Sequence, residues 1–450
     1  MHPDPSVSLW PDPEALGPVT DLYQLTMMAG YHAAGLDRQR ATFEMFVRRL
    51  PETRAYLVFA GLEQAIGDLL RLAFSPEQVE AIRRWPVFAN IDPAFFDELA
   101  TLRFEGDLWA VPEGTIVFPG EPLIRVEGPL SQAQWVETFL LTSIGYPTLV
   151  ASKAARVVEA AAGRPVFDFG LRRGHGAHAG MLAARAAYLA GCAGTSNVEA
   201  ARRLAIPASG TMAHSWVQAF DHEADAFATF AKVFPENATM LVDTYDVERG
   251  VALAAAIEPP VQAIRIDSGD LAALGHRARA ILDAHDRASV RLFASGDLDE
   301  FAIERLIMAG VPYDAFGVGT EMITSRDAPA LAIVYKLVEL EGVGRMKLSA
   351  HKKTYPMGKQ VYRVRDPQGR FALDFVTKKD EPSDGEPLLL PYLRDGKLVR
   401  PLPRLDEIRA YCATQRAGLP DALRGNASRA HYPMAYSAAL EAEAERLGVR

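Results

Sequence analysis

Between residues 165 and 319 of this 450-residue chain, short apolar runs alternate with segments of helical periodicity. The apolar runs span residues 166–169, 240–243, 263–267, 290–294 and 313–319. Strands that alternate with helices of about 10–15 residues are typical of βα units around a parallel sheet. We therefore expect an α/β fold, with the parallel sheet either doubly wound or closed into a barrel.

Polar residues follow the apolar runs, at the end where each predicted strand stops. In a doubly wound sheet and in a barrel alike, ligands bind at the carboxyl ends of the strands. The residues expected at this edge are Arg172, Arg173, His214, Asp243, 267–270, 295–297 and 317–320. Their shared position predicts one composite active site.

His214 follows a flexible Ser-Gly-Thr turn at residues 209–211 and lies beside Trp216 and Phe220. A lone histidine next to aromatic residues is most often structural, and this window alone leaves that alternative open. The small residues of the turn let a ligand approach the backbone, and the hydroxyl of Thr211 can hold an oxyanion. The polar loops downstream favour a functional histidine.

Arg265 and Asp267 are two residues apart on one predicted strand, so their side chains face the same way. An arginine in the mouth of a barrel suggests an anionic substrate, and an Arg265–Asp267 pair is the structural alternative. Asp243 ends the neighbouring strand. Asp243 and Asp267 can bind ribose hydroxyls or Mg²⁺, with helix capping as the alternative.

Two glycine-containing loops, residues 294–297 and 317–320, follow the last two predicted strands. Each offers backbone N–H groups before a helix, and barrels often bind phosphate in the loops after their last two strands. We expect a phosphate site there. Tyr23 and Phe169 are candidate aromatic platforms for a flat ligand.

Composition excludes several classes of protein. The net charge of −9 argues against a general nucleic-acid binder. The two cysteines, Cys192 and Cys412, are too few for a four-thiolate zinc site. The chain start lacks the pattern of a signal peptide, and no apolar run reaches the ~18–20 residues that span a bilayer. We expect a cytoplasmic enzyme without zinc, nucleic-acid or membrane partners.

Helix and turn signals recur along the chain. A helix is expected after Thr20 or Asp21, and Ser75 to Gln78 form a capping box. The pattern of residues 106–128 predicts antiparallel strands with tight turns. Ser196 is the expected cap of a helix near residue 199.

Nine motifs occur in the order found in one enzyme family. They are Thr-Asp-Leu-Tyr-Gln-Leu-Thr-Met (20–27), Phe-Asp-Phe-Gly-Leu-Arg-Arg (167–173), Gly-Thr-Ser-Asn-Val (194–198), Gly-Thr-Met-Ala-His-Ser-Trp (210–216), Asp-Thr-Tyr-Asp (243–246), Ile-Arg-Ile-Asp-Ser-Gly-Asp-Leu (264–271), Phe-Ala-Ser-Gly-Asp-Leu (293–298), Gly-Val-Gly-Thr (317–320) and Lys-Leu-Ser (347–349). Through these motifs the chain resembles the nicotinate phosphoribosyltransferases, members of the type II phosphoribosyltransferases.

The resemblance implies an irregular TIM-like (β/α) barrel. A smaller α+β or β-sandwich domain would be built from the N-terminal region and from strands that follow the barrel. The implied division is an extended segment at 1–17, an N-terminal α+β domain with connecting helices at 18–163, and the barrel at 164–335. Residues 336–450 would supply strands that return to the N-terminal domain and C-terminal helices.

The resemblance also implies a reaction. Nicotinate and phosphoribosyl pyrophosphate would give nicotinate mononucleotide and pyrophosphate in NAD salvage, with ATP hydrolysis coupled to the transfer and Mg²⁺ as cofactor. His214 falls at the transiently phosphorylated histidine of the family. Tyr23 and Phe169 fall at the positions that sandwich the pyridine ring, and Tyr23 would come from the neighbouring subunit of a homodimer.

The other site residues are assigned by the same resemblance. Arg265, Thr211 and Arg172 match carboxylate-binding positions, and Asp243 and Asp267 match the ribose and metal region. The positions that match the phosphoribosyl diphosphate site are Ser295, Gly296, Gly317, Gly319 and Thr320.

Some features depart from the family or leave alternatives open. Residues 174–176 read Gly-His-Gly, where the family more often has Ala-Gln-Gly. Nicotinamide-specific relatives carry an aspartate at the position of Ser196. A nicotinamide enzyme, the shorter quinolinate phosphoribosyltransferase and a non-catalytic homologue are the alternatives. The roles of Lys352, Lys353 and Lys359 stay open.

Overall fold

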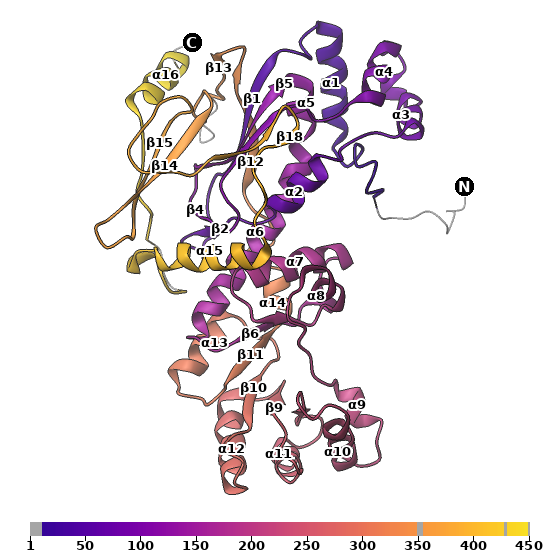
Figure 1. Ribbon diagram of the computed structural model, residues 1–450, viewed down its shortest axis with the longest axis vertical. Coiled ribbons are helices and arrows are strands. Elements are labelled where there is room, and N and C mark those ends of the chain that lie inside the picture. The colour runs from indigo at the N-terminus through magenta and orange to yellow at the C-terminus, as the bar shows by residue number, and fades with distance from the viewer. Residues whose placement is uncertain (1–10, 349–353, 427–429, 449–450) are drawn as a thin grey trace.

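The computed structural model describes residues 11–348, 354–426 and 430–448. Two regions of different architecture follow each other along its long axis (Figure 1). The upper region contains antiparallel sheets, and the lower region contains a parallel sheet with its helices. The chain passes from the upper region to the lower one and back.

In the described part of the chain, the lower region has a parallel sheet of six strands in the order β7-β6-β11-β10-β9-β8. The strands are β6 (Val166–Asp168), β7 (Gly194–Thr195), β8 (Thr239–Leu241), β9 (Ala263–Ile266), β10 (Arg291–Ala294) and β11 (Ala315–Val318). The predicted parallel sheet and α/β class are confirmed. Among the described residues, β7 and β8 are edge strands that do not pair with each other, so the sheet is a curled half-barrel.

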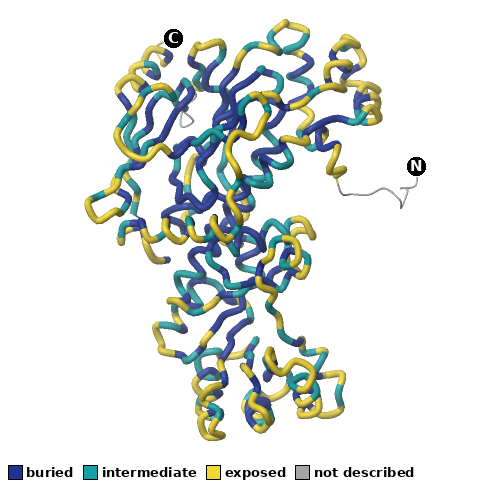
Figure 2. The backbone as a smooth tube through the Cα atoms, in the orientation of Figure 1, coloured by how far each residue is buried: buried dark blue, intermediate teal, exposed yellow. Residues whose placement is uncertain are grey.

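Helices cover one face of this sheet. They are α7 (Ala177–Leu189), α8 (Val198–Leu204), α9 (His214–Gln218), α10 (Glu223–Val233), α11 (Val247–Ala255), α12 (Leu271–Ala284), α13 (Glu300–Met308) and α14 (Thr320–Ile323). Successive strand residues point to opposite faces, so Ile264, Leu292 and Phe316 join the helix-packed core. Arg265 and Phe293 lie on the other face. Figure 2 shows buried strands and exposed outer turns on α10 to α12.

The upper region combines strands from both ends of the chain. Its largest sheet has the order β13-β12-β1-β5-β3-β17-β18, and β1 pairs antiparallel with β12 and β5. These strands are β1 (Arg40–Val47), β3 (Asp107–Ala110), β5 (Pro122–Pro129), β12 (Ile333–Leu340), β13 (Val343–Gly344), β17 (Leu390–Arg394) and β18 (Lys397–Leu398). The smaller sheets contain β14 (Lys359–Arg365), β15 (Phe371–Lys378), β16 (Glu386–Pro387) and β19 (Met434–Tyr436), and β2 (Leu57–Val58) with β4 (Ile116–Val117).

The remaining helices lie around these sheets or between the regions. They are α1 (Leu22–Ala34), α2 (Leu62–Leu69), α3 (Pro76–Arg83), α4 (Pro93–Thr101), α5 (Leu130–Trp135), α6 (Glu137–Ala160), α15 (Leu405–Ala417) and α16 (Ala438–Gly448). Because α6 contacts β2 in the upper region and α7 and α13 in the lower one, it joins the two. No helix among the described residues has the length and apolar character of a membrane span.

The predicted helix caps are confirmed only in part. Ser75 and Gln78 form the predicted capping box at the start of α3. The prediction that Ser196 caps α8 is wrong, because Asn197 occupies the N-cap and its side chain accepts a hydrogen bond from Ala200 N at 3.1 Å. Asp21 lies at the N-cap of α1 but makes no side-chain capping bond.

Candidate active site

Arg265 organises a cluster of polar side chains at the carboxyl ends of the parallel strands. Its Nε donates to Ser295 Oγ at 2.7 Å, and its Nη1 donates to Thr211 Oγ1 at 2.9 Å. Its Nη2 donates to Asp267 Oδ1 at 2.5 Å, which is the pair expected from their spacing. The structure thus brings together predicted residues from β9, β10 and the loop before α9.

Asp267 keeps its negative charge in this cluster. Burial raises the pKa of Asp267, but the Arg265 charge and the Ser295 hydroxyl outweigh burial and bring it below the ordinary value. Oδ1 accepts both of those hydrogen bonds. The second oxygen, Oδ2, faces His214 Nε2 at 3.9 Å, so a charged oxygen is turned toward the open side of the cluster.

His214 is the first residue of α9, and its side chain is 41% exposed. Its Nδ1 shares a hydrogen bond of 3.1 Å with Thr244 Oγ1. The imidazole therefore lies between Thr244 and Asp267 and still opens to solvent. Thr244 was not among the predicted site residues, although its position next to Asp243 in the motif at 243–246 was a signal for it.

Asp243 follows β8, and its side chain binds two residues that follow β9. Its Oδ2 accepts hydrogen bonds from Asp267 N at 3.2 Å and Ser268 Oγ at 2.5 Å. Its Oδ1 is buried without a hydrogen-bond partner among the described residues. The N-caps of α11 and α12 are Asp246 and Asp270, so capping does not explain Asp243 and Asp267. Asp243 Oδ1 thus has unmet hydrogen-bonding capacity, and Asp267 Oδ2 faces the open side of the cluster.

Phe169 provides an aromatic surface beside the cation. Its ring stacks on Phe293, with centroids 5.6 Å apart and an interplanar angle of 11°. The Arg265 guanidinium lies 5.5 Å from the Phe169 ring centroid. Phe293 was not predicted as a site residue, although it stands two residues before Ser295, which follows β10, and therefore faces the same way.

Two of the predicted phosphate-binding glycines lie where the chain has no room for a side chain. Gly296 has φ +91°, and a Cβ there would lie 1.8 Å from the Asp267 carbonyl oxygen, so only glycine fits. A Cβ at Gly317 would lie 2.6 Å from the Phe169 ring. Gly319 is the N-cap of α14, and Thr320 is its first residue.

Two other residues were predicted to contact nicotinate, and both are exposed. Arg172 is exposed in the short 3₁₀ helix Leu171–Arg173. Tyr23 is on α1, 47% exposed, and Figure 1 places α1 in the upper region, far from β9 and β10. One chain by itself does not bring Tyr23 to Phe169.

A cavity of about 710 Å³ lies at the opposite, amino ends of the parallel strands. Pro165, Gln262, Arg291 and Asp314 line it where β6, β9, β10 and β11 begin. Further in, the cavity is bounded by residues that include Phe167, Thr211, Ala263, Phe293 and Ala315. Thr211 and Phe293 therefore border both the cavity and the Arg265 cluster.

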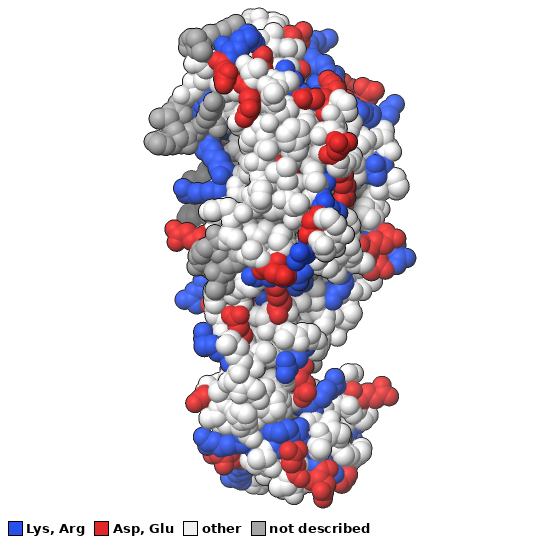
Figure 3. Space-filling view, turned by 90° about the vertical axis from the view of Figure 1, so that its left-hand side faces the viewer, with Lys and Arg blue, Asp and Glu red and all other residues white. Residues whose placement is uncertain are grey.

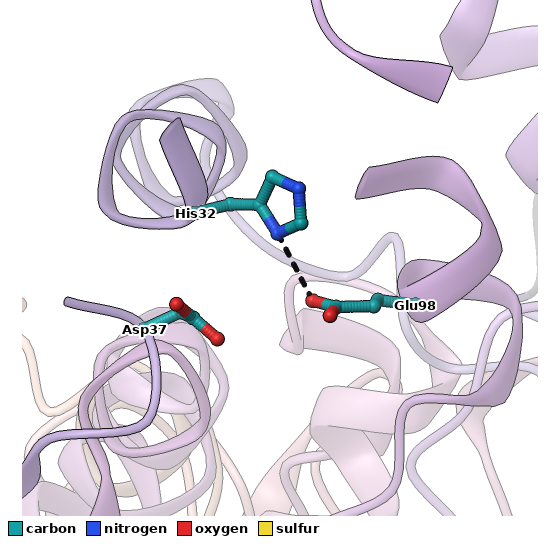
Figure 4. A group of neighbouring side chains, drawn as sticks. All are labelled: His32, Asp37 and Glu98. Carbon is teal, nitrogen blue, oxygen red and sulfur yellow. Dashed lines mark hydrogen bonds and ion pairs between the residues drawn. The ribbon is translucent and has the colours of Figure 1, made fainter. Parts of the chain in front are cut away.

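A group of possible metal ligands in the upper region has another explanation. Atoms of His32, Asp37 and Glu98 lie within 4.8 Å of one another (Figure 4). His32 Nδ1 is 3.2 Å from Glu98 Oε2, and Arg38 lies 3.5 Å from Glu98 and 3.6 Å from Asp37. Because the Arg38 guanidinium contacts both carboxylates and His32 of α1 pairs with Glu98 of α4, we interpret this group as an ion-pair cluster between the two helices.

Lys359 lies away from the active site. It is buried in β14, and its Nζ is 2.7 Å from Glu44 Oε2. Burial lowers the pKa of Lys359, and the Glu44 carboxylate opposes that effect. The contact is structural. Lys352 and Lys353 lie outside the described residues.

Charges of both signs are interspersed over the face seen in Figure 3. That face therefore lacks the broad basic surface by which proteins bind the phosphates of nucleic acids.

Comparison with known proteins gives consistent matches along the chain. Three family models match: the nicotinate phosphoribosyltransferase N-terminal domain at residues 19–145, the nicotinate phosphoribosyltransferase family at 165–371 and the C-terminal domain at 381–443. The sequence is 45% identical over 436 residues to the nicotinate phosphoribosyltransferase pncB2 of Mycobacterium tuberculosis, covering 95% of this chain and 93% of that protein. It is 40% identical over 376 residues to nicotinate phosphoribosyltransferase of Bacillus subtilis, covering 80% and 76%. The crystal structure of human nicotinic acid phosphoribosyltransferase has a TM-score of 0.86 and 31% identity, covering 95% and 99%.

Proposed function

The chain belongs to the nicotinate phosphoribosyltransferase family, and we propose that it joins nicotinate to the phosphoribosyl group of phosphoribosyl pyrophosphate. The products are nicotinate mononucleotide and pyrophosphate, in the salvage route to NAD. The observation that carries the proposal is the Arg265 guanidinium beside the Phe169 ring at 5.5 Å. A cation next to an aromatic face matches a planar aromatic carboxylate.

The transfer depends mainly on positioning. Displacement at the anomeric carbon passes through an oxocarbenium-like state, so the enzyme must align the ring nitrogen and stabilise the departing pyrophosphate. Arg265, with Thr211 and Arg172, holds the nicotinate carboxylate, and Phe169 holds the ring. The phosphoribosyl diphosphate contacts are assigned to Ser295, Gly296, Gly317, Gly319 and Thr320.

The carboxylates fit a magnesium ion. Asp243 Oδ1 is buried without a hydrogen-bond partner among the described residues, and Asp267 Oδ2 lies 3.9 Å from His214 Nε2. Oxygen donors of this kind suit Mg²⁺. Asp243 and Asp267 would hold this ion and contact the ribose, and the ion would supply positive charge beside the diphosphate group.

ATP hydrolysis is coupled to transfer through His214. A neutral imidazole nitrogen attacks the γ-phosphorus of ATP, the bond to the ADP oxygen breaks, and ADP leaves. Water later attacks the phosphoimidazole, which releases phosphate and restores the histidine. The 3.1 Å contact with Thr244 supports this role because it fixes the ring plane.

We assign the parallel sheet to an irregular TIM-like barrel and the working enzyme to a cytoplasmic homodimer. The position of Tyr23 on α1, away from β9 and β10 in one chain, supports a shared site. Tyr23 of a second copy then covers the nicotinate ring opposite Phe169. Nucleic acid and membrane have no part in this function.

Ser196 and Arg265 favour the acid over the amide. An aspartate at position 196 would repel the nicotinate carboxylate, whereas serine has no charge. Ser196→Asp is expected to reduce nicotinate use sharply. Comparable kcat/KM for nicotinate and nicotinamide in the parent protein would contradict this selectivity and favour the nicotinamide alternative.

One assay tests the proposal: mononucleotide formation from nicotinate and from nicotinamide, each with and without ATP. Nicotinate-dependent product that ATP increases is the expected result, and no product would favour a non-catalytic homologue. His214→Asn should abolish incorporation of labelled γ-phosphate and leave slow ATP-independent transfer. Labelling of this variant would refute the assignment of His214.

A further inference from the structure

The rings of Phe167, Phe293 and Phe169 stack in a row on the inner face of the parallel sheet. The Phe293 centroid is 5.7 Å from that of Phe167 and 5.6 Å from that of Phe169, with interplanar angles of 28° and 11°. Phe169 ends the row beside Arg265. The plane of the Phe169 ring therefore follows that of Phe293.

Gly317 gives these rings their space. A Cβ atom at Gly317 would lie 2.6 Å from Cδ2 of Phe169 and 2.9 Å from Cε1 of Phe293. Both distances are too short for a carbon–carbon contact. Gly317 lies within β11 and is not among the glycines with positive φ, so its backbone conformation does not require glycine. What this position requires is the absence of a side chain under the rings.

A cavity borders Phe293 on the inner side of the sheet. In a (β/α) barrel, layers of side chains ordinarily fill this interior. Here the cavity of about 710 Å³ reaches Phe293 and is lined nearby by the small side chains of Ala263 and Ala315. The cavity touches Phe293 and Phe167 but not Phe169, so Phe293 stands between the cavity and Phe169.

We propose that Phe293 and Gly317 are positioning residues for the aromatic ring of the substrate. They hold the Phe169 ring beside Arg265, so that a planar carboxylic acid meets the aromatic face and the cation together. The inference rests on the proposed function and gives Gly317 a role toward nicotinate in place of phosphoribosyl diphosphate. Aromatic pairs of this kind change binding roughly 2- to 12-fold.

Phe293→Leu removes the ring and keeps an apolar side chain. We expect the KM for nicotinate to rise roughly 3- to 10-fold while the KM for phosphoribosyl pyrophosphate and kcat stay unchanged. Phe316 provides a matched control, because it is buried on the next strand and faces the helices. Phe316→Leu should lower the thermal midpoint without changing either KM. An unchanged nicotinate KM in Phe293→Leu would overturn the proposal.

A double-mutant cycle tests whether Phe293 acts through Phe169. In a Phe169→Leu background, Phe293→Leu should add little to the nicotinate KM, because the ring that it positions is already gone. Fully additive effects of the two substitutions would overturn this part of the proposal. The same purified variants give nicotinate affinity by equilibrium dialysis, which is independent of turnover.

Gly317→Ala separates the two possible roles of Gly317. A rise confined to the nicotinate KM supports the ring-positioning role, and a rise confined to the phosphoribosyl pyrophosphate KM overturns it. If the alanine variant does not fold, Gly317→Ala combined with Phe293→Leu provides room for the new methyl group. Recovery of folding in the double variant supports contact between the two positions, and continued failure to fold counts against it.

Two different outcomes separate a wrong positioning role for Phe293 from a wrong proposed function. A parent protein that forms no mononucleotide from nicotinate refutes the function. An active parent whose Phe293→Leu variant keeps the parental nicotinate KM refutes only the positioning role.

Discussion

Two of the charged clusters in this protein differ in how completely their charges are enclosed. In the cluster around Glu300, which joins α6 to α13, Lys153 Nζ lies 2.7 Å from one carboxylate oxygen and Arg156 Nη2 lies 3.1 Å from the other. The Glu300 and Lys153 side chains are 0% and 1% exposed. In the cluster around Arg265, Asp267 is 23% and His214 is 41% exposed.

The difference separates a structural cluster from one that can bind a ligand. Around Glu300, each carboxylate oxygen faces a cation inside the protein, so no group there is free to meet a substrate. Around Arg265, Oδ2 of Asp267 and the imidazole of His214 face the open side. Both clusters pair an arginine with a carboxylate, and they differ in how far these groups are exposed.

The largest expected effect is on the enclosed cluster. Glu300→Ala leaves Lys153 and Arg156 without the carboxylate between them, which should reduce the free energy of unfolding by about 3–5 kcal/mol. Urea unfolding measures this loss, and kcat per folded molecule should stay at the parental value. Glu199→Gln, which breaks an exposed pair with Arg202, is the control and should leave stability unchanged. Parental stability in Glu300→Ala would mean that the enclosed charges are not coupled.

The next largest effect is expected for a substitution in the open cluster around Arg265, which should change function more than stability. Arg265→Leu removes the cation that selects the acid, and mismatched buried charges typically cost about 2–5 kcal/mol. The preference for nicotinate over nicotinamide should fall roughly 30-fold to several-thousand-fold. Steady-state kinetics with both substrates measures the change. Selectivity that survives the substitution would place carboxylate recognition elsewhere.

A smaller effect is expected for Tyr23→Ala. This substitution tests whether a second copy of the chain covers the open side of the Arg265 cluster. Tyr23→Ala should weaken nicotinate binding by about 0.5–1.5 kcal/mol, the usual worth of an aromatic pair. Mixing Tyr23→Ala chains with Arg265→Leu chains should restore part of the activity, since a mixed dimer contains one site with both native residues. Full activity in a monomeric preparation would contradict a shared site.

The smallest effect concerns the pH dependence of stability. The pKa of Asp267 is lowered in the folded protein, so its carboxylate stabilises the fold at pH above the ordinary value of about 3.9. This contribution is lost as pH falls through the folded-state pKa. The stability difference between parent and Asp267→Asn, on the order of 1 kcal/mol or less for a partly exposed charge, should shrink as pH falls from about 5 through the lowered folded-state pKa. A difference that stays constant over this range would rule out the linkage.

Patterns in the sequence predicted the parallel strands, several helix starts and the family. Apolar periodicity located the parallel strands, and the capping box at Ser75 marked the start of α3. These signals are local, because hydrogen bonding and side-chain direction within one element depend on nearby residues. The alternation of strands and helices also predicted that Asp267 and Ser295 lie at one edge of the sheet.

The use of those residues depends on contacts between distant segments of the chain. Asn197, not Ser196, caps α8, and Thr244 contacts His214 across 30 positions of the sequence. The space that Gly317 leaves under Phe169 depends on packing between β6 and β11, which no local pattern encodes. Sequence fixes which chemical groups are available, whereas exposure, ring stacking and unpaired oxygens arise only when distant segments meet.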